Sequence, residues 1–126
     1  MESIDSLENS VVLVIDDEKE TCILLAAIIH KNRLKAAYVH TLEDAVKSIS
    51  KVTPVLIFLD INLPDGNGID FLIHLSIHYP EIHVVIISAF DSYKAKAEEL
   101  GAYAFLIKPF SKEAVMDILS TSVNHA

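Results

Sequence analysis

Several residue types are scarce in this sequence, and each shortage excludes a class of protein. There is one cysteine, Cys22, which excludes an internal disulfide and a cysteine-based zinc site. Ten Lys and Arg residues oppose eighteen Asp and Glu residues, so the chain lacks the clustered cations that direct nucleic-acid binding requires. No apolar run approaches the roughly 20 residues that span a membrane. We therefore expect a soluble cytoplasmic protein that binds neither nucleic acid nor membrane directly.

The length and the hydrophobic content predict a single folded domain. The chain has 126 residues, of which 52% are hydrophobic, and this is enough to build one core. Residues 1–10 are polar and acidic; they do not resemble a signal peptide and are interpreted as a solvated lead-in. Residues 11–123 are interpreted as the domain itself.

Two patterns of apolar residues alternate along the chain. The first consists of short continuous runs that are typical of strands buried on both faces of a parallel sheet. These runs lie at residues 11–15, 36–39, 55–59, 84–87 and 103–107. The second pattern has helical spacing, as in the stripe of Cys22, Leu25, Ala26 and Ile29, where Cys22 is expected to be an inert core residue. Five strand–helix repeats predict an α/β fold with a doubly wound, five-stranded parallel sheet and helices on both of its faces.

Polar and conformationally special residues mark the predicted helix boundaries. Thr41, Asp91 and Ser111 stand where three of the helices should begin, because their side chains accept hydrogen bonds from free N–H groups. Pro80 and Gly101 should end the two helices that precede them.

Charged and polar residues follow the predicted strands, where ligands bind in an open parallel sheet. Asp16 and Asp17 follow the first strand, Asp60 follows the third, Ser88 the fourth and Lys108 the fifth. If the first, third, fourth and fifth strands are neighbours in that order, these side chains share one cleft. Clustered carboxylates repel one another unless a cation lies among them. Mg²⁺ prefers such oxygen ligands, and a carboxylate can accept a phosphoryl group whose charge a metal and an ammonium neutralise.

This arrangement resembles the receiver domain of bacterial two-component response regulators. The resemblance extends from Val11 to Val123 and implies the flavodoxin-like (βα)5 fold with strand order 2-1-3-4-5. Five motifs, which follow the first, third, fourth and fifth predicted strands, carry it. They are Asp16-Asp17, Asp60, the loop Leu63-Pro64-Asp65-Gly66-Asn67-Gly68, Ser88 and Lys108-Pro109.

The resemblance implies a phosphoacceptor and a metal site. Asp60 would accept the phosphoryl group. Asp17, Asp60 and the main-chain carbonyl of Asn62 would bind Mg²⁺, or Mn²⁺ as an alternative, while Asp16 would act mainly through a metal-bound water. Lys108 would pair with the acceptor carboxylate and then with the phosphoryl group.

Other residues would shape the site or respond to phosphorylation. Ser88 and Phe105 would form the switch pair, although threonine and tyrosine are the more frequent choices in the family. Pro64, Gly68 and Pro109 would be structural, and the Lys108–Pro109 peptide is expected to be cis.

The resemblance and the residue chemistry also suggest which side chains set the lifetime of the phosphoryl group. Asn62 and Phe90 would flank the path of the water molecule that hydrolyses it. Asn62 can guide that water through a hydrogen bond, whereas the Phe90 ring would shield the phosphoryl group.

The implied function is that of a signalling switch rather than an enzyme acting on other molecules. The phosphoryl donor would be a sensor histidine kinase or a histidine phosphotransfer protein. A downstream protein or output domain would bind the surface of the fourth helix, the strand at 103–107 and the last helix, and phosphorylation could produce a homodimer. The only catalysis expected is of the domain's own phosphorylation and dephosphorylation.

Three other functions are weighed against this one. A phosphatase of the haloacid dehalogenase type also uses an aspartate after a strand with Mg²⁺, but Asn62 stands where that class needs a second aspartate. A flavodoxin-like cofactor protein binds phosphate in the loop after its first strand, and here residues 16–18 are all acidic. A receiver-like module that binds partners without phosphorylation would not need the complete acidic set with Lys108.

Three histidines form a second group with metal-ligating chemistry. His74 and His78 are four residues apart on a predicted helix, and His83 follows. That spacing could hold a metal ion, but no cysteine or carboxylate nearby completes a set. The pattern therefore favours a solvated helix face over a metal site.

Overall fold

We obtained a computed structural model of the chain that describes residues 10–123. Apart from Ser10, the predicted lead-in at residues 1–10 lies outside the described residues. Five parallel strands form one sheet in the order β2-β1-β3-β6-β7. The strands are β1 (Val11–Ile15), β2 (Lys35–Val39), β3 (Leu56–Asp60), β6 (His83–Ser88) and β7 (Ala104–Ile107). This order confirms the predicted 2-1-3-4-5 topology, because the two short strands numbered β4 and β5 form a separate hairpin.

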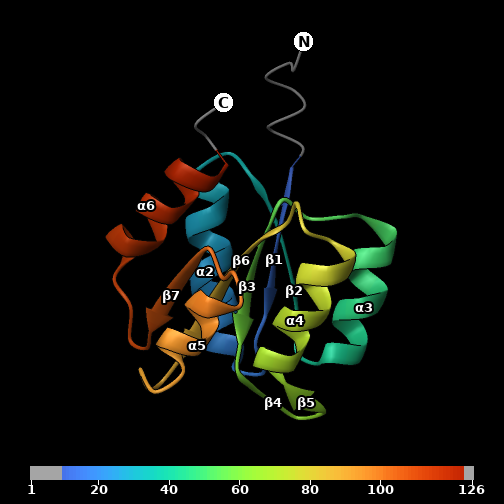
Figure 1. Cartoon of the computed structure of the whole chain (residues 1–126). Helices are drawn as coiled ribbons and strands as arrows, with labels where there is room; N and C mark the ends of the chain where they lie inside the picture. Colours follow the sequence, from blue (N-terminus) through green and yellow to red (C-terminus); the bar gives the residue numbers. More distant parts are fainter. Residues whose placement is uncertain (1–9, 124–126) are drawn as a thin grey trace.

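Helices cover both faces of the sheet (Figure 1). They are α2 (Lys19–Lys31), α3 (Leu42–Lys51), α4 (Gly68–His78), α5 (Lys94–Glu99) and α6 (Lys112–Ser122). Helices α2 and α6 pack on one face, while α3, α4 and α5 pack on the other. The predicted doubly wound, flavodoxin-like α/β fold is therefore confirmed. Across residues 10–123, none of the helices is long and apolar enough to cross a membrane.

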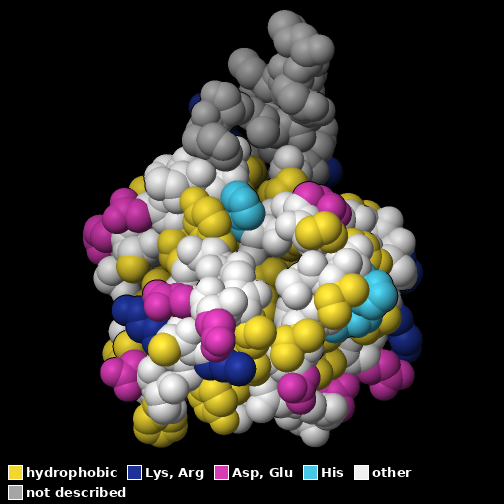
Figure 2. Space-filling view, viewed as in Figure 1, with side chains coloured by type: hydrophobic (Ala, Val, Ile, Leu, Met, Phe, Trp, Pro, Cys, Tyr) yellow, Lys and Arg dark blue, Asp and Glu magenta, His cyan; other side chains and the backbone are white. Residues whose placement is uncertain are grey.

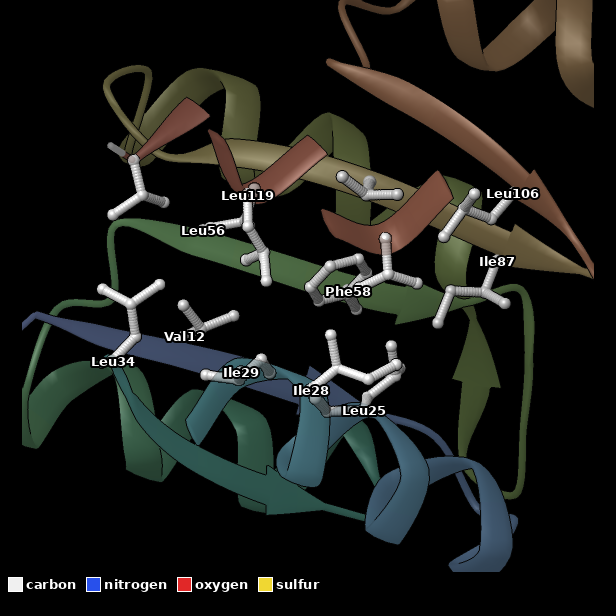
Figure 3. Packing of buried hydrophobic residues seen from close by; sticks show 14 of the residues in the cluster. Val12, Leu25, Ile28, Ile29, Leu34, Leu56, Phe58, Ile87, Leu106 and Leu119 are labelled. Atoms are coloured by element: carbon white, nitrogen blue, oxygen red, sulfur yellow. The ribbon is translucent and has the colours of Figure 1, made fainter. Parts of the chain in front are cut away.

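The central strands β1, β3 and β6 are almost continuously apolar because both of their faces are buried. Along β3, Leu56 and Phe58 point toward α2 and α6, whereas Ile57 and Leu59 point toward the other helices. All four side chains are fully buried. Figure 3 shows the Phe58 ring between the sheet and the helices, close to Leu25 of α2. The alternation of strand side chains thus joins two hydrophobic layers through one sheet.

Most of the predicted helix boundaries are confirmed. The Thr41 hydroxyl accepts a hydrogen bond from the Asp44 N–H, and the Ser111 hydroxyl accepts one from the Ala114 N–H, both at 3.1 Å. The predicted start at Asp91 is wrong, because α5 begins only at Lys94. The Asp91 carbonyl instead accepts a hydrogen bond from the Lys94 N–H and closes a turn ahead of the helix.

Helix ends also follow the sequence signals. Helix α4 stops at His78, two residues before Pro80. Helix α5 stops at Glu99, and Gly101 follows with a φ of 93°, a left-handed conformation that glycine adopts without a steric penalty.

A small hairpin connects β3 to α4. Its strands are β4 (Asn62–Leu63) and β5 (Gly66–Asn67), and Pro64 and Asp65 form the turn between them. The Asp65 carboxylate accepts hydrogen bonds from the Leu42 and Glu43 N–H groups, each at 2.9 Å. The hairpin is therefore fastened to the first turn of α3, beside the carboxyl edge of the sheet.

Candidate functional site

The predicted site residues meet at the carboxyl edge of the sheet. Asp60 is the last residue of β3 and Ser88 the last of β6, while Asp16 directly follows β1 and Lys108 directly follows β7. These strands are neighbours in the sheet. The Lys108 N–H also donates to the Ser88 carbonyl at 2.8 Å, which continues the β6–β7 pairing beyond β7.

Three carboxylates form the centre of the site. Asp16, Asp17 and Asp60 each place one oxygen so that all three oxygens lie within 4.8 Å of one another. Asp16 is fully buried and Asp60 is 7% exposed, whereas Asp17 faces solvent. Burial, followed by the charge of Asp16, raises the pKa of Asp60 to about 6. A cation among the three would relieve this repulsion, and an all-oxygen donor set with one exposed member suits Mg²⁺, which keeps several waters.

The backbone of Asp16 is held on both sides. Its N–H donates to the Val39 carbonyl at 3.1 Å. Its carbonyl oxygen lies 2.9 Å from His40 Nδ1 and accepts a hydrogen bond from the Cys22 thiol at 3.3 Å. One oxygen of its side chain, Oδ1, accepts a hydrogen bond from the Glu18 N–H at 2.8 Å. These contacts fix the position of the carboxylate, and its buried Oδ2 oxygen lies 2.9 Å from Lys108 Nζ.

Lys108 provides the positive charge of the site. Its Nζ lies 2.9 Å from Asp16 Oδ2 and 3.6 Å from Asp60 Oδ2, and it donates a hydrogen bond to Glu18 Oε1. Burial acts to lower the pKa of Lys108, but its hydrogen bonds to Glu18 and Asp16 and the charges of Asp16 and Asp60 together raise that pKa above the usual value. The same contact with Lys108 lowers the pKa of Glu18. The ammonium is therefore charged, and in this structure it lies closer to Glu18 and Asp16 than to Asp60.

An open cleft of about 710 Å³ lies in front of the acidic residues. Asp17, Asp60, Asn62 and Lys108 line its polar side. Leu24 of α2 and Phe110, which follows the Lys108–Pro109 peptide, are among the apolar residues of its wall. The cleft thus combines carboxylates, an ammonium and an accessible entrance.

Comparison with known proteins identifies the family. The protein-family model of the response regulator receiver domain matches residues 12–120, which is most of the chain. The chain belongs to this family. The receiver domain is 28% identical over 120 residues to the DNA-binding transcriptional regulator NtrC of Proteus hauseri, but it spans only 25% of that protein. It is 31% identical to protein CcdB of Bacillus subtilis, covering 90% of this chain and 98% of CcdB.

A solved structure agrees with the curated relatives. The receiver domain of NtrX from Brucella abortus superposes with a TM-score of 0.83 at 28% sequence identity. The superposition covers 91% of this chain and 99% of the NtrX domain. Both the fold and the family therefore match the resemblance carried by the sequence motifs.

The predicted switch residues of the receiver domain lie in strands β6 and β7. Ser88 is buried, and its hydroxyl accepts a hydrogen bond from the Phe90 N–H at 3.1 Å. Phe105 is half-buried in β7 and packs against the core layer on the α3–α5 side of the sheet. Its register partner in β6 is Ile86, two residues before Ser88. The two predicted switch residues thus lie on adjacent strands.

The residues predicted to set the lifetime of the phosphoryl group differ in position. Asn62 lines the cleft, as does Ala89. Phe90 is 69% exposed and does not line the cleft. Its shielding role stays a prediction.

The loop residues predicted to be structural have identifiable backbone roles. The Lys108–Pro109 peptide is cis, as expected. The Gly68 N–H donates to the Ile61 carbonyl at 2.7 Å. A Cβ atom at position 68 would lie 2.1 Å from the Asp60 carbonyl oxygen, so the first turn of α4 can approach the end of β3 only because residue 68 is glycine.

The sequence motifs did not reveal two contacts of the site. Glu18 belongs to the acidic run after β1, but its pairing with Lys108 joins residues 90 positions apart. His40 follows β2, and only the β1–β2 pairing brings it to the carbonyl of Asp16. The acidic run Asp16-Asp17-Glu18 was the one available signal, and it did not distinguish a metal ligand from a partner of lysine.

Proposed function

We propose that this receiver domain is a phosphoacceptor switch. It takes a phosphoryl group from a sensor histidine kinase or a histidine phosphotransfer protein onto Asp60, with Mg²⁺ bound, and then changes its partner-binding surface. The observation that carries the proposal is the position of Asp60. Its carboxylate ends the central strand, lies within 4.8 Å of two further carboxylate oxygens, and has Lys108 Nζ 3.6 Å away at an open cleft.

In the proposed reaction, a carboxylate oxygen of Asp60 attacks the phosphorus atom of a phosphohistidine. A P–O bond forms, the P–N bond breaks, and its electron pair stays on the departing imidazole. Lys108 neutralises negative charge on the phosphoryl oxygens, and the Ser88 hydroxyl donates a hydrogen bond to one of them. In this structure the Ser88 hydroxyl accepts a hydrogen bond from the Phe90 N–H, which leaves its own proton available to be donated.

The metal would be held by Asp17, Asp60 and the main-chain carbonyl of Asn62, with Asp16 acting through water. When bound, Mg²⁺ supplies positive charge that offsets the phosphoryl oxygens and the clustered carboxylates. Mn²⁺ would use the same oxygen donors. Support comes from the three carboxylate oxygens already lying close together.

The output of the switch is proposed to lie on the surface formed by α5, β7 and α6. Exposed apolar side chains on or next to these elements favour protein binding there; they include Tyr93, Ile107 and Met116. A downstream protein, an output domain or a second phosphorylated copy would bind this surface. Inward rotation of Ser88 would leave space for Phe105 and change the contacts that β7 offers.

Amide exchange tests this switch. A phosphoryl mimic bound with Mg²⁺ should change protection within residues 88–110 relative to Mg²⁺ alone. Unchanged protection in that range, with binding of the mimic verified by an independent measurement, would contradict the proposed change in surface.

The proposal makes the domain a catalyst only of its own phosphorylation and dephosphorylation. A phosphatase of the haloacid dehalogenase type uses a second aspartate two residues after the nucleophile as its general acid and base, and Asn62, which stands at that position here, cannot serve in that role. We also propose that the protein acts in the bacterial cytoplasm, where its phosphodonors would be found.

The decisive experiment measures intact mass after incubation with a small-molecule phosphodonor and Mg²⁺. The wild-type chain should gain one phosphoryl group, and omission of Mg²⁺ should abolish the gain. Asp60→Asn should gain none, whereas the control Asp70→Asn, at an exposed position of α4, should behave like wild type. Undiminished uptake by Asp60→Asn would refute the assignment of Asp60.

A further inference from the structure

Helix α4 presents two histidines one turn apart on its solvent-exposed side. His74 and His78 are both exposed, and residues four apart on a helix are neighbours on its surface. Their ring centroids lie 4.5 Å apart with an interplanar angle of 44°. Figure 2 shows histidine surface in the region of α3 and α4 of Figure 1, beside hydrophobic residues.

The separation of the rings fits a metal ion held between them. Imidazole nitrogens bind Zn²⁺ at about 2.0–2.1 Å, and two imidazoles bound at right angles to each other have their ring centroids roughly 4.5 Å apart. The observed separation of 4.5 Å matches this value. Right-angled nitrogen ligands are typical of Ni²⁺ and Cu²⁺ sites.

The backbone and one ring of the pair are already positioned by the core. The His74 ring stacks on Phe71 at 5.6 Å with an interplanar angle of 21°, and Phe71 is buried. Leu72 and Leu75 anchor the opposite side of α4 in the core. A pair of ligands on a rigid, anchored helix loses little conformational freedom when an ion binds.

We propose that His74 and His78 form a second metal site, which binds a transition-metal ion such as Ni²⁺ or Cu²⁺. It differs in chemistry from the acidic cleft, because imidazole nitrogen favours these ions whereas Mg²⁺ favours oxygen. Within residues 10–123, the acidic triad is the only group of three or more such side chains placed to share an ion. The histidine pair therefore supplies two ligands, and water completes the coordination, so that the ion remains exchangeable.

The test is a calorimetric titration of the full chain with Ni²⁺ in excess Mg²⁺, in which any Ni²⁺ bound at the acidic cleft is identified as the binding that both His74→Ala and His78→Ala retain. The wild-type chain should bind one Ni²⁺ ion at this site. His74→Ala and His78→Ala should each weaken that binding by about tenfold or more, because each leaves a single imidazole. His30→Ala, which removes another exposed histidine near the end of a helix, should bind like wild type.

A variant with altered spacing tests whether metal binding depends on the positions of the two histidines or only on their number. Ser76→His combined with His78→Ala keeps the number of histidines but places them two residues apart, on different sides of α4. It should bind as weakly as His78→Ala, and circular dichroism should show all variants folded, since the altered side chains are exposed. Binding of wild-type strength by His74→Ala, by His78→Ala or by the variant with altered spacing would overturn the proposal.

Discussion

Replacing Gly68 with alanine should displace Asp60 in the acidic cleft, although the substitution changes none of the side chains that line the cleft. A Cβ atom at position 68 would lie 2.1 Å from the Asp60 carbonyl oxygen and 2.9 Å from Ile61 Cα. Ordinary van der Waals contact begins at 3.4 Å, so α4 and the end of β3 must separate by 3.4 − 2.1 = 1.3 Å. Both neighbours are backbone atoms, and no side-chain rotation can relieve the clash.

The size of the effect follows from two opposing terms. Overpacking of this kind costs about 1–3 kcal/mol, whereas alanine gains about 0.5–1 kcal/mol over glycine in a helix. The clash therefore dominates, and we expect a net loss of about 1–2 kcal/mol in the free energy of unfolding. For a domain of this size, that loss lowers Tm by roughly 3–8 °C. A displacement of about 1 Å at a reacting group costs on the order of 100-fold in rate.

The assay compares Tm and the rate of phosphorylation by a small phosphodonor in Gly68→Ala and Gly66→Ala. At position 66, the nearest atom to a new Cβ is the Leu42 Cδ1 methyl at 2.7 Å, and a flexible side chain can move away. Gly66→Ala should therefore stay close to wild type in both measurements. The reasoning is refuted if Gly68→Ala keeps the Tm of wild type and a rate within about twofold of it.

Three further predictions concern other parts of the chain. The hydrogen bonds from the Leu42 and Glu43 N–H groups lower the pKa of Asp65 in the folded protein. The ionised Asp65 carboxylate therefore stabilises the fold above its unfolded pKa of about 3.9. This stabilisation is lost as the pH falls through the lower pKa of the folded protein. Asp65→Asn should accordingly be less stable than wild type at pH 7, and the difference in Tm should shrink below about pH 4; a constant difference would contradict this. Phe58→Ala should lose about 3–5 kcal/mol in denaturant unfolding, because the ring is fully buried, and a loss below about 1 kcal/mol would show that this layer is loosely packed. If Phe90 shields the phosphoryl group, Phe90→Glu and Phe90→Ala should both dephosphorylate faster than wild type, and decay as slow as that of wild type in both variants would exclude shielding.

The strands and helix starts that could be predicted from the sequence are those marked by residues within or next to the same element. Continuous β-branched runs identified β1, β3 and β6, since strands buried on both faces need apolar side chains at every position. Thr41 and Ser111 identified helix starts, because each hydroxyl satisfies an N–H group of its own helix. Asp91 carried the same signal but lies in a turn, where its backbone rather than its side chain makes the bond.

The hairpin of β4 and β5 was not predicted, and the reason is its length. Each of its strands has two residues, too few for a hydrophobic period to show. At the site, the sequence supplied the identity of the strand-end residues, but it could not show the pairing of Glu18 with Lys108 or the contact of His40 with Asp16. Both contacts depend on how separate strands lie in the sheet.

Sheet register also determines which changes in chain length the cleft can tolerate. Asp60 is held at the end of β3 by pairing with β1 on one side and β6 on the other. Deletion of one residue within β3 would move Asp60 by about 3.3 Å and turn alternate side chains to the opposite face. Changes on the solvent-facing sides of the helices leave that register intact. The outer surface can therefore diverge through evolution and acquire new partners, while the carboxylates and Lys108 keep their mutual positions.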